Sequence, residues 1–362
     1  MPIASERVSE ALLYSKQSDG SVICQLCAHR CVIRPGRRGI CWVRENRGGT
    51  LVTLVSDRVI GVNIDPIEKK PFFHFLPGSF SYSISTVGCN FHCLFCQNWE
   101  ISQWPREHVG QVPGTPTTAA EIVASARATG CESIAYTYTE PTIFFELALD
   151  TCRLAAEAGL KNLFVTNGYM TAEALEVVAP VLDAANIDLK SFSDSFYRKV
   201  CSATLGPVLE TVRRMRERDI WVEVTTLVIP GRNDSDEELG KLARWLADTD
   251  RNMPWHISAF YPAYKMLDVP PTPPHTLSRA ASIGEAAGLR FVYIGNVPGD
   301  RWENTLCPEC GRQLVQHRGF AVLAQCLVDG RCPSCRTAIP GVWEIEGAAR
   351  PPGSHASSQA LR

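Results

Sequence analysis

The stretch that decides the fold is Gly88-Cys-Asn-Phe-His-Cys-Leu-Phe-Cys-Gln97. Its cysteines, Cys89, Cys93 and Cys96, follow a C-x3-C-x2-C spacing, so one short loop supplies three thiolates. Iron–sulfur clusters are usually held by four cysteines, and three therefore leave one iron open to another ligand. Zinc is the alternative, but a structural zinc site is normally closed by four protein ligands. The next cysteine, Cys131, lies 35 residues downstream, so the spacing favours an iron–sulfur cluster.

The same loop resembles the signature of the radical S-adenosylmethionine (SAM) superfamily, with Phe95 at the aromatic position before the third cysteine. The longer string 88–102 is similar to the radical-SAM component of the AmmeMemoRadiSam system, a group related to the pyruvate formate-lyase activating enzymes. The resemblance extends over about residues 20–345 and is specific for the family but not for the substrate. Further segments that share it are Asp65–Gly78, Tyr136–Pro141, Val165–Tyr169, Ile187–Lys190 and Tyr293–Val297.

The resemblance implies how an open iron would be used. In radical-SAM enzymes the amino and carboxylate groups of SAM chelate that iron, and a reduced 4Fe–4S cluster cleaves the sulfonium. The resulting 5′-deoxyadenosyl radical abstracts hydrogen from a substrate. We therefore expect an enzyme with a 4Fe–4S cluster and SAM as cofactors and an unidentified substrate. The alternatives are a glycyl-radical-enzyme activase and, from another class, an iron–sulfur electron-transfer or scaffold protein.

Partners follow from the same resemblance. The reaction implies a one-electron donor such as flavodoxin or ferredoxin, and the name of the system implies Memo-like and Ammecr-like proteins. No residue of the sequence displays an interface for either of them.

The resemblance also assigns a SAM contact to Glu140. The related enzymes carry a Gly-Gly-Glu motif there, and its acid grips the SAM amino group through a charge-assisted hydrogen bond. Here Tyr138 and Thr139 replace both glycines, which leaves open how closely the backbone approaches SAM. A helix-starting acid before Pro141 is the alternative, because acids favour helix N-termini.

Three other motifs complete the expected cofactor site. Thr166 and Asn167 resemble the Thr-Asn-Gly of the activating enzymes, and Asp188 and Lys190 match their Asp-Leu-Lys, whose lysine meets the carboxylate side of SAM. Asn296 is a weaker match at the adenine edge. The expected cofactor-binding set is Phe95, Thr139, Glu140, Thr166, Asn167, Asp188, Lys190 and Asn296.

Two further cysteine groups lie at the ends of the chain. The first, C-x2-C-x3-C-x9-C, offers four thiolates: Cys24, Cys27, Cys31 and Cys41. Structural zinc is the first interpretation, and a second iron–sulfur cluster is the next, because spacing alone does not separate the two metals. The second group approximates a zinc ribbon and predicts structural zinc. It consists of the pairs Cys307 with Cys310 and Cys332 with Cys335.

From Ser81 onward the sequence alternates between strand and helix patterns, and seven such strands indicate parallel βαβ units of an α/β fold. A barrel and an open sheet both fit this alternation. The polar motifs all fall at strand ends, which favours a partial (β/α) TIM-type barrel whose mouth carries the active site. The predicted organisation is a metal module (1–48), a connecting hairpin and loop (49–79), the barrel (80–300), a zinc-ribbon-like module (301–346) and a disordered tail (347–362).

The composition is that of an ordinary globular enzyme, with 45% hydrophobic and 20% charged residues among 362. A net charge of −2 gives no reason to expect nucleic acid or an anionic membrane as partner. No apolar run approaches the ~18 residues that span a bilayer. The N-terminus lacks the apolar core of a secretory signal. We therefore expect a cytoplasmic protein whose C-x2-C pairs bind metal rather than form disulfides.

Overall fold

The computed structural model describes residues 8–295 and 301–344, and its centre is one eight-stranded sheet in the order β16-β15-β14-β13-β12-β11-β9-β8. The neighbouring strands from β9 to β16 pair in parallel, while β8 (Gly61–Pro66) pairs antiparallel with β9 (Phe80–Ser85) at one edge. The other parallel strands are β11 (Ser133–Tyr136), β12 (Lys161–Thr166), β13 (Ala184–Asp188), β14 (Trp221–Val228), β15 (Trp255–Ala259) and β16 (Val292–Gly295).

The parallel strands follow one another across the sheet in chain order. A doubly wound sheet reverses its strand order at a switch point, so this sheet is not doubly wound. Within residues 8–295 and 301–344, the edge strands β16 and β8 do not pair with each other. A mostly parallel α/β sheet is therefore confirmed, and closure into a barrel is not shown.

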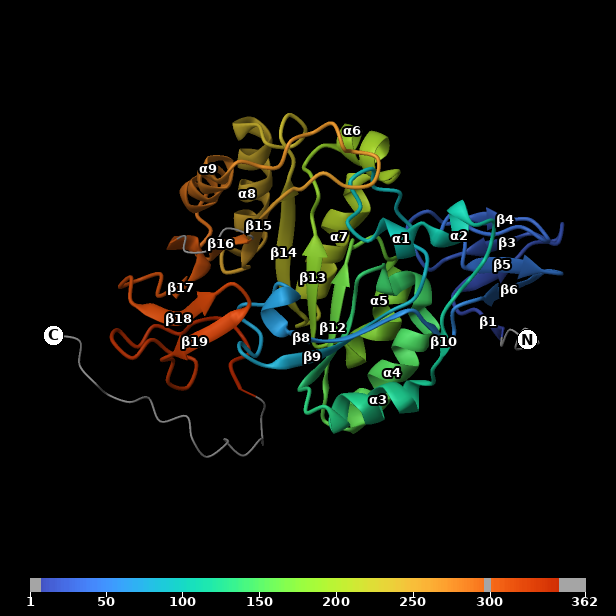
Figure 1. The fold of residues 1–362 in the computed structure, drawn as a ribbon, viewed down its shortest axis with the longest axis horizontal. Coiled ribbons are helices and arrows are strands. Elements are labelled where there is room, and N and C mark those ends of the chain that lie inside the picture. Colours follow the sequence, from blue (N-terminus) through green and yellow to red (C-terminus); the bar gives the residue numbers. More distant parts are fainter. Residues whose placement is uncertain (1–7, 296–300, 345–362) are drawn as a thin grey trace.

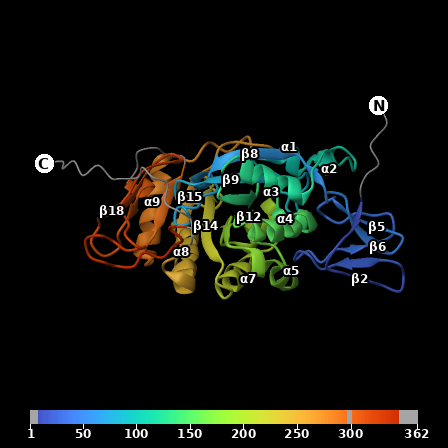
Figure 2. The same ribbon diagram turned by 90° about the horizontal axis from the view of Figure 1, so that it is seen from below.

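Amphipathic helices connect the strands. In α7, the buried positions Val208, Thr211, Val212 and Met215 recur at the spacing of one helical face. Figure 2 shows α5, α7 and α8 along one side of the sheet. The longer helices are α3 (Ala119–Ala128), α4 (Phe145–Glu157), α5 (Ala172–Val178), α7 (Leu205–Arg216), α8 (Asp236–Asp250) and α9 (Pro274–Ala286). The short ones are α1 (Trp99–Ser102), α2 (Trp104–Glu107), α6 (Asp194–Phe196), the π-helix Tyr197–Cys201 and the 3-10 helices Ile67–Lys69, Pro141–Phe144, Ala179–Val181 and Arg301–Glu303.

Small antiparallel sheets make up the N-terminal part. One has the order β2-β3-β4, another the order β1-β6-β5, and β10 pairs with β7. These strands are β1 (Ser9–Glu10), β2 (Tyr14–Lys16), β3 (Val22–Cys24), β4 (Val32–Ile33), β5 (Arg44–Arg47), β6 (Thr50–Thr53), β7 (Arg58–Val59) and β10 (Thr115–Pro116).

The prediction of a hairpin within the connecting segment 49–79 is wrong, because its strands pair with strands outside it. The strand at 50–53 pairs backward with β5, while β8 joins the central sheet. Gly48 and Gly49 make this possible because both adopt positive φ, +60° and +87°, which a two-residue hairpin turn requires. The hairpin therefore crosses the predicted boundary between residues 48 and 49.

The C-terminal module is a three-stranded sheet of β17 (Thr305–Leu306), β18 (Gln313–Arg318) and β19 (Ala321–Gln325). It packs on the segment after β8, where Leu76 N donates to the carbonyl of Val342 at 2.6 Å. Figure 1 shows the N-terminal sheets and this module at opposite ends of the central sheet. Among the described residues, no helix has the length and apolar character needed to cross a membrane.

Candidate active site

The cysteine loop leaves the C-terminal end of β9 through Gly88, whose φ of +97° is readily adopted only by glycine. A Cβ at this position would lie 2.9 Å from the carbonyl oxygen of Cys41 and 2.8 Å from Val43 Cγ1. On its other side the loop is held by His92 N, which donates to the carbonyl of Cys201 at 3.0 Å. The loop is thus fixed between the N-terminal module and the segment after β13.

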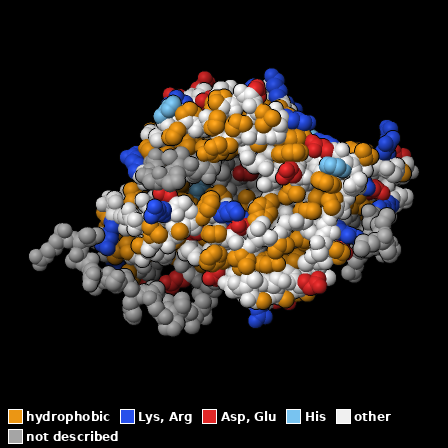
Figure 3. Space-filling model, viewed as in Figure 1, with side chains coloured by type: hydrophobic (Ala, Val, Ile, Leu, Met, Phe, Trp, Pro, Cys, Tyr) orange, Lys and Arg blue, Asp and Glu red, His pale blue; other side chains and the backbone are white. Residues whose placement is uncertain are grey.

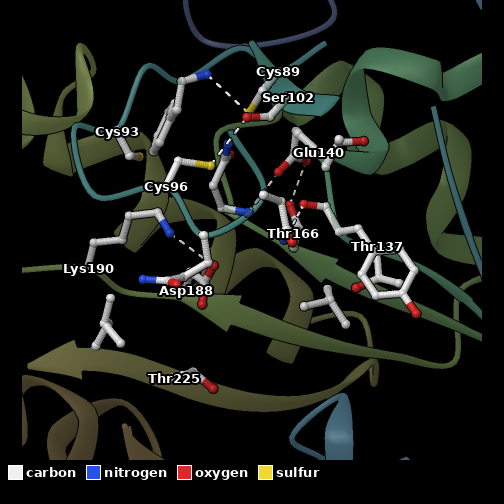
Figure 4. A pocket seen from close by; sticks show the side chains of 18 of the residues that line it. Cys89, Cys93, Cys96, Ser102, Thr137, Glu140, Thr166, Asp188, Lys190 and Thr225 are labelled. Carbon is white, nitrogen blue, oxygen red and sulfur yellow. Dashed lines mark hydrogen bonds and ion pairs between the residues drawn. The ribbon is translucent and has the colours of Figure 1, made fainter. Parts of the chain in front are cut away.

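The three loop cysteines line one cavity of about 430 Å³, within the size range of small-molecule sites. Figure 4 shows them along one side of the cavity, with Glu140 and Thr166 on a second side and Asp188 and Lys190 on a third. The face of the molecule seen in Figure 3 is hollowed near its centre. The predicted residues that line the cavity are Phe95, Thr139, Glu140, Thr166, Asn167, Asp188 and Lys190. Asn296 lies outside the described residues.

Glu140 is buried at the end of the loop after β11, and four donors hold its carboxylate. Oε1 accepts from Thr142 N at 3.1 Å, from Thr142 Oγ1 at 2.5 Å and from Thr166 Oγ1 at 2.7 Å. Oε2 accepts from Asn167 N at 2.8 Å, so it keeps room for another donor. Burial raises the pKa of Glu140, although these hydrogen bonds oppose the rise. Glu140 also caps the helix that starts at Pro141. It therefore begins a helix, as the alternative interpretation expected, and also lines the cavity.

Lys190 and Asp188 face the loop cysteines from the end of β13. Lys190 Nζ lies 3.0 Å from Asp188 Oδ2 and 5.8 Å from the centre of the Phe95 ring. Burial opposes the charge of Lys190, but Asp188 and the Cys93 sulfur raise its pKa well above the ordinary value. Lys190 therefore places a positive charge beside the cysteine loop.

Asn167 and Thr139 are held by the surrounding backbone and side chains. Asn167 Nδ2 donates to Asn90 Oδ1 at 2.7 Å, and its own Oδ1 accepts from Tyr169 N at 3.0 Å. Thr139 Oγ1 donates to the carbonyl of Thr86 at 2.9 Å. Both residues thus shape the cavity wall with polar groups that are already partly bonded.

Tyr138 resolves the question left by the missing glycines. It adopts φ +62°, a left-handed conformation that is costly for a bulky residue. Its hydroxyl donates to Asp65 Oδ2 in a short hydrogen bond, and Lys70 Nζ lies 4.3 Å from its ring centre. The backbone after β11 therefore follows a path typical of glycine, and side-chain contacts compensate for the strain.

Lys69 and Lys70, which follow β8, both bind Asp65, at 2.8 Å and 2.6 Å. Burial disfavours the charged carboxylate, but hydrogen bonds from Lys69, Lys70 and Tyr138 hold the pKa of Asp65 well below its ordinary range. Burial lowers the pKa of Lys70 to about 8. Both lysines line the cysteine cavity.

A second cavity, of about 600 Å³, adjoins the first, because Lys69 and Ser258 line both. Gly319 and Phe320, from the turn between β18 and β19, form part of its wall. Tyr261 also lines it. The C-terminal module thus contributes directly to a space beside the cysteine loop.

Cys201 is a neighbour of the site that sequence reasoning did not identify. Its side chain is fully buried beside Cys93, and the interaction between the two thiols lowers the pKa of Cys93. It packs in the hydrophobic core rather than along the cavity wall. The strand-and-helix pattern holds no signal for this contact, because the two cysteines are more than a hundred residues apart.

The terminal cysteine groups differ in geometry. The C-terminal four have all their sulfurs within 4.8 Å of one another, and within residues 8–295 and 301–344 they form the only group of three or more possible ligands that meets this condition. The four N-terminal cysteines instead line an internal cavity of their own. The three loop thiols are likewise spread around a cavity, which suits a group larger than a single ion.

Comparison with known proteins identifies relatives of this chain. A family model described as the radical SAM superfamily matches residues 83–246. An uncharacterized protein of Methanocaldococcus jannaschii is 47% identical over 312 residues, which are 86% of this chain and 92% of that protein. The pyruvate formate-lyase 1-activating enzyme of Escherichia coli is 22% identical over 221 residues, 57% of this chain and 89% of that enzyme. A solved radical SAM methyltransferase from Sphaerobacter thermophilus has 18% identity and a TM-score of 0.47, covering 62% of this chain and 68% of that one.

Proposed function

This chain belongs to the radical SAM superfamily and is an enzyme, and on that premise we propose that it cleaves SAM reductively and abstracts hydrogen from a substrate held in the second cavity. Membership implies a 4Fe–4S cluster and SAM as cofactors. The chemistry that the bound cluster supplies is one-electron reduction of SAM, which yields methionine and a 5′-deoxyadenosyl radical able to take hydrogen from the substrate.

One observation carries the proposal. Cys89, Cys93 and Cys96 share a cavity with an anionic group, Glu140, and a cationic group, Lys190. SAM carries an ammonium and a carboxylate, so the cavity offers a partner of opposite charge for each. An electron-transfer or scaffold protein requires neither partner, and this argues against that alternative.

The residues of the chain have separate tasks in this proposal. The open acceptor position on Glu140 Oε2 receives the ammonium of SAM, and Thr166 and Asn167 hold that carboxylate in place. Lys190 faces the carboxylate of SAM, and Asp188 orients the Lys190 ammonium through their hydrogen bond. Glu140, Thr166 and Asn167 are buried, so little water competes for the carboxylate and its attraction for the ammonium is strengthened.

The second cavity is the proposed substrate site. It joins the first at Lys69 and Ser258, so a substrate there would lie next to the SAM-binding groups. Because the turn at Gly319 and Phe320 closes one side, the site suits a small molecule or a short peptide segment better than a folded domain.

Anaerobic incubation of the reconstituted full chain with SAM and dithionite tests the cleavage. We expect 5′-deoxyadenosine in the complete mixture and none without reductant. If the complete mixture yields none while the chain holds its iron, the proposed function is wrong. If 5′-deoxyadenosine does form, transfer of deuterium from labelled candidate substrates into it would identify the substrate.

A second candidate function is activation of a glycyl-radical enzyme. It is favoured by the similarity to the pyruvate formate-lyase 1-activating enzyme, which extends over 89% of that protein. In this case the hydrogen would come from a glycine Cα of a partner protein, and electron paramagnetic resonance would detect a glycyl radical on the partner. Deuterium transfer from a free small molecule would instead exclude this function.

Three finer assignments belong to the same proposal. The motifs at 65–78 and 88–102 support membership in the AmmeMemoRadiSam group, with Memo-like and Ammecr-like partners. A flavodoxin or ferredoxin is the proposed electron donor. The C-terminal quartet is proposed to hold structural zinc, because its Cys307–Cys335 and Cys310–Cys332 sulfur pairs lie 3.5 and 3.6 Å apart. Sulfurs that share one ion at about 2.3 Å are expected about 3.8 Å apart.

A further inference from the structure

The N-terminal cysteines surround a space rather than a point. Cys24, Cys27, Cys31 and Cys41 all line one internal cavity, whose other walls include the apolar side chains of Leu26, Ile33, Ile40 and Ile143. No three of these thiols lie within 4.8 Å of one another, as judged over residues 8–295 and 301–344. The thiols therefore face a common space without meeting as the ligands of one ion meet.

The C-terminal quartet gives an internal standard for this difference. Both groups contain a C-x2-C pair, Cys24 with Cys27 and Cys307 with Cys310, so the local spacing is the same. In the C-terminal group the second pair closes onto the first until all four sulfurs are mutually within 4.8 Å. In the N-terminal group Cys31 ends the loop that carries Cys27, Cys41 lies in the next loop, and no three of the thiols come within 4.8 Å of one another among the described residues.

We infer that the N-terminal cysteines hold an iron–sulfur cluster of the four-iron type rather than zinc. Four thiolates on a single ion of about 2.3 Å bond length must crowd together. In a four-iron cluster each thiolate binds its own iron, so the sulfurs lie farther apart around a central space. The N-terminal group shares this spread with the loop of Cys89, Cys93 and Cys96, and not with the C-terminal quartet.

The surroundings fit a buried anionic centre. Arg44 lines the cavity, is 1% exposed, and directs Nη1 toward Cys24 Sγ at 3.9 Å. A short ion pair with Glu146 fixes its guanidinium, while its Nε has no partner among the described residues. A buried cation beside sulfur stabilises thiolates. His29 also lines this cavity, but its Nε2 is bonded to the carbonyl of Asn90 at 2.8 Å.

The proposed centre is a neighbour of the active-site loop. Asn90, next to Cys89, lines the N-terminal cavity, and Cys41 lies against Gly88. Because four thiolates would occupy all four irons, this centre has no open position for SAM. Its presence does not depend on the proposed function, since it concerns a different set of cysteines.

The test counts metal in a variant that lacks the active-site loop thiols. The full chain carrying Cys89→Ser, Cys93→Ser and Cys96→Ser is purified and reconstituted anaerobically, and its iron, sulfide and zinc are measured. We expect about four irons and four sulfides per chain, with one zinc. Adding Cys24→Ser and Cys27→Ser should remove the remaining iron. The matched control adds Cys307→Ser and Cys310→Ser instead, which should remove zinc and leave the iron.

Wild-type protein provides a second measurement if these variants fold poorly. We expect about eight irons per chain, and after reduction two paramagnetic signals, only one of which changes when SAM is added. About four irons with two zincs per chain overturns the inference. A single ion of any kind bound at the N-terminal cysteines overturns it as well.

Discussion

The active-site loop and the C-terminal quartet use the same local unit for different ends. Cys93 with Cys96 and Cys307 with Cys310 are both C-x2-C pairs. The pair at 307–310 meets a second pair, and the four sulfurs close on one another. The pair at 93–96 meets Glu140 and Lys190 across a cavity. The difference teaches that the short spacing selects a metal, whereas the groups opposite it decide whether anything else can bind.

The largest expected effect separates the two regions directly. Cys93→Ser should reduce 5′-deoxyadenosine formation to background, because the loop then has only two thiolates. Cys310→Ser, the matched change in the quartet, should lose zinc and lower the melting temperature while the folded fraction still cleaves SAM. Product per folded chain and metal content are the measurements. Equal loss of SAM cleavage in both variants would contradict the assignment of cleavage to the loop and of a structural role to the quartet.

The next effect concerns the charged groups opposite the loop. Glu140→Gln should weaken SAM binding about 10- to 150-fold, the equivalent of about 1.5–3 kcal/mol for a hydrogen bond to a charged group. Isothermal titration calorimetry of the cluster-loaded enzyme with SAM measures this change in affinity. The exposed Glu237→Gln on α8 is the control and should bind SAM as the wild type does. Unchanged affinity in Glu140→Gln would remove Glu140 from the site.

The same residue gives a pH dependence. Burial raises the pKa of Glu140, and only the ionised carboxylate pairs with the ammonium of SAM. SAM affinity should therefore be full above the pKa of Glu140 and decline as the pH falls through it. Glu140→Gln should lose this dependence, because the amide does not titrate. A decline of the same size in the variant would assign it to another group.

Glycine substitution tests how firmly each cysteine unit is held. Gly88→Ala places a Cβ at 2.8–2.9 Å from Val43 and Cys41 at φ +97°. Gly311→Ala, beside the quartet, meets the same backbone strain at φ +72° but has no atom within 4 Å. We expect Gly311→Ala to cost about 1–3 kcal/mol from strain and Gly88→Ala to cost more, with loss of iron. Thermal unfolding and iron content compare the two.

The smallest expected effect lies behind the loop. Cys201→Ala removes the thiol that lies beside Cys93 and could donate a hydrogen bond to a cluster-bound sulfur there. Hydrogen bonds to cluster sulfurs favour the more negative, reduced state, so the reduction potential should fall while SAM affinity stays the same. Cys326→Ala, in the C-terminal module, is the control and should leave the potential unchanged. Redox titration followed by paramagnetic resonance measures the shift, and an unchanged potential in Cys201→Ala would leave the contact purely structural.

Much of the site was accessible from the sequence because its residues follow strand ends. Glu140, Thr166, Asp188 and Lys190 lie at or just after the C-terminal ends of three consecutive parallel strands, and these ends meet at one edge of the sheet. The structure confirms that they share a cavity with the loop cysteines. The parallel α/β sheet followed from the same alternation.

Other features depended on contacts that no local pattern encodes. The positive φ of Tyr138 is accompanied by contacts with Asp65, in β8, and with Lys70, in the segment after it. The second cavity exists because the turn at 319–320 reaches back to β15 and β16. The misplaced hairpin shows the same, since β6 pairs with β5 and β8 pairs with β9 rather than the two pairing with each other.

The sequence by itself determined the ligand types, their short spacings and the alternation of strands and helices, because these are properties of neighbours along the chain. The tertiary structure alone decided how far apart the sulfurs of each group stand and which charges face them. The physical reason is that metal nuclearity and cofactor binding depend on distances across the fold. Those distances are set by the packing of segments that are remote in sequence.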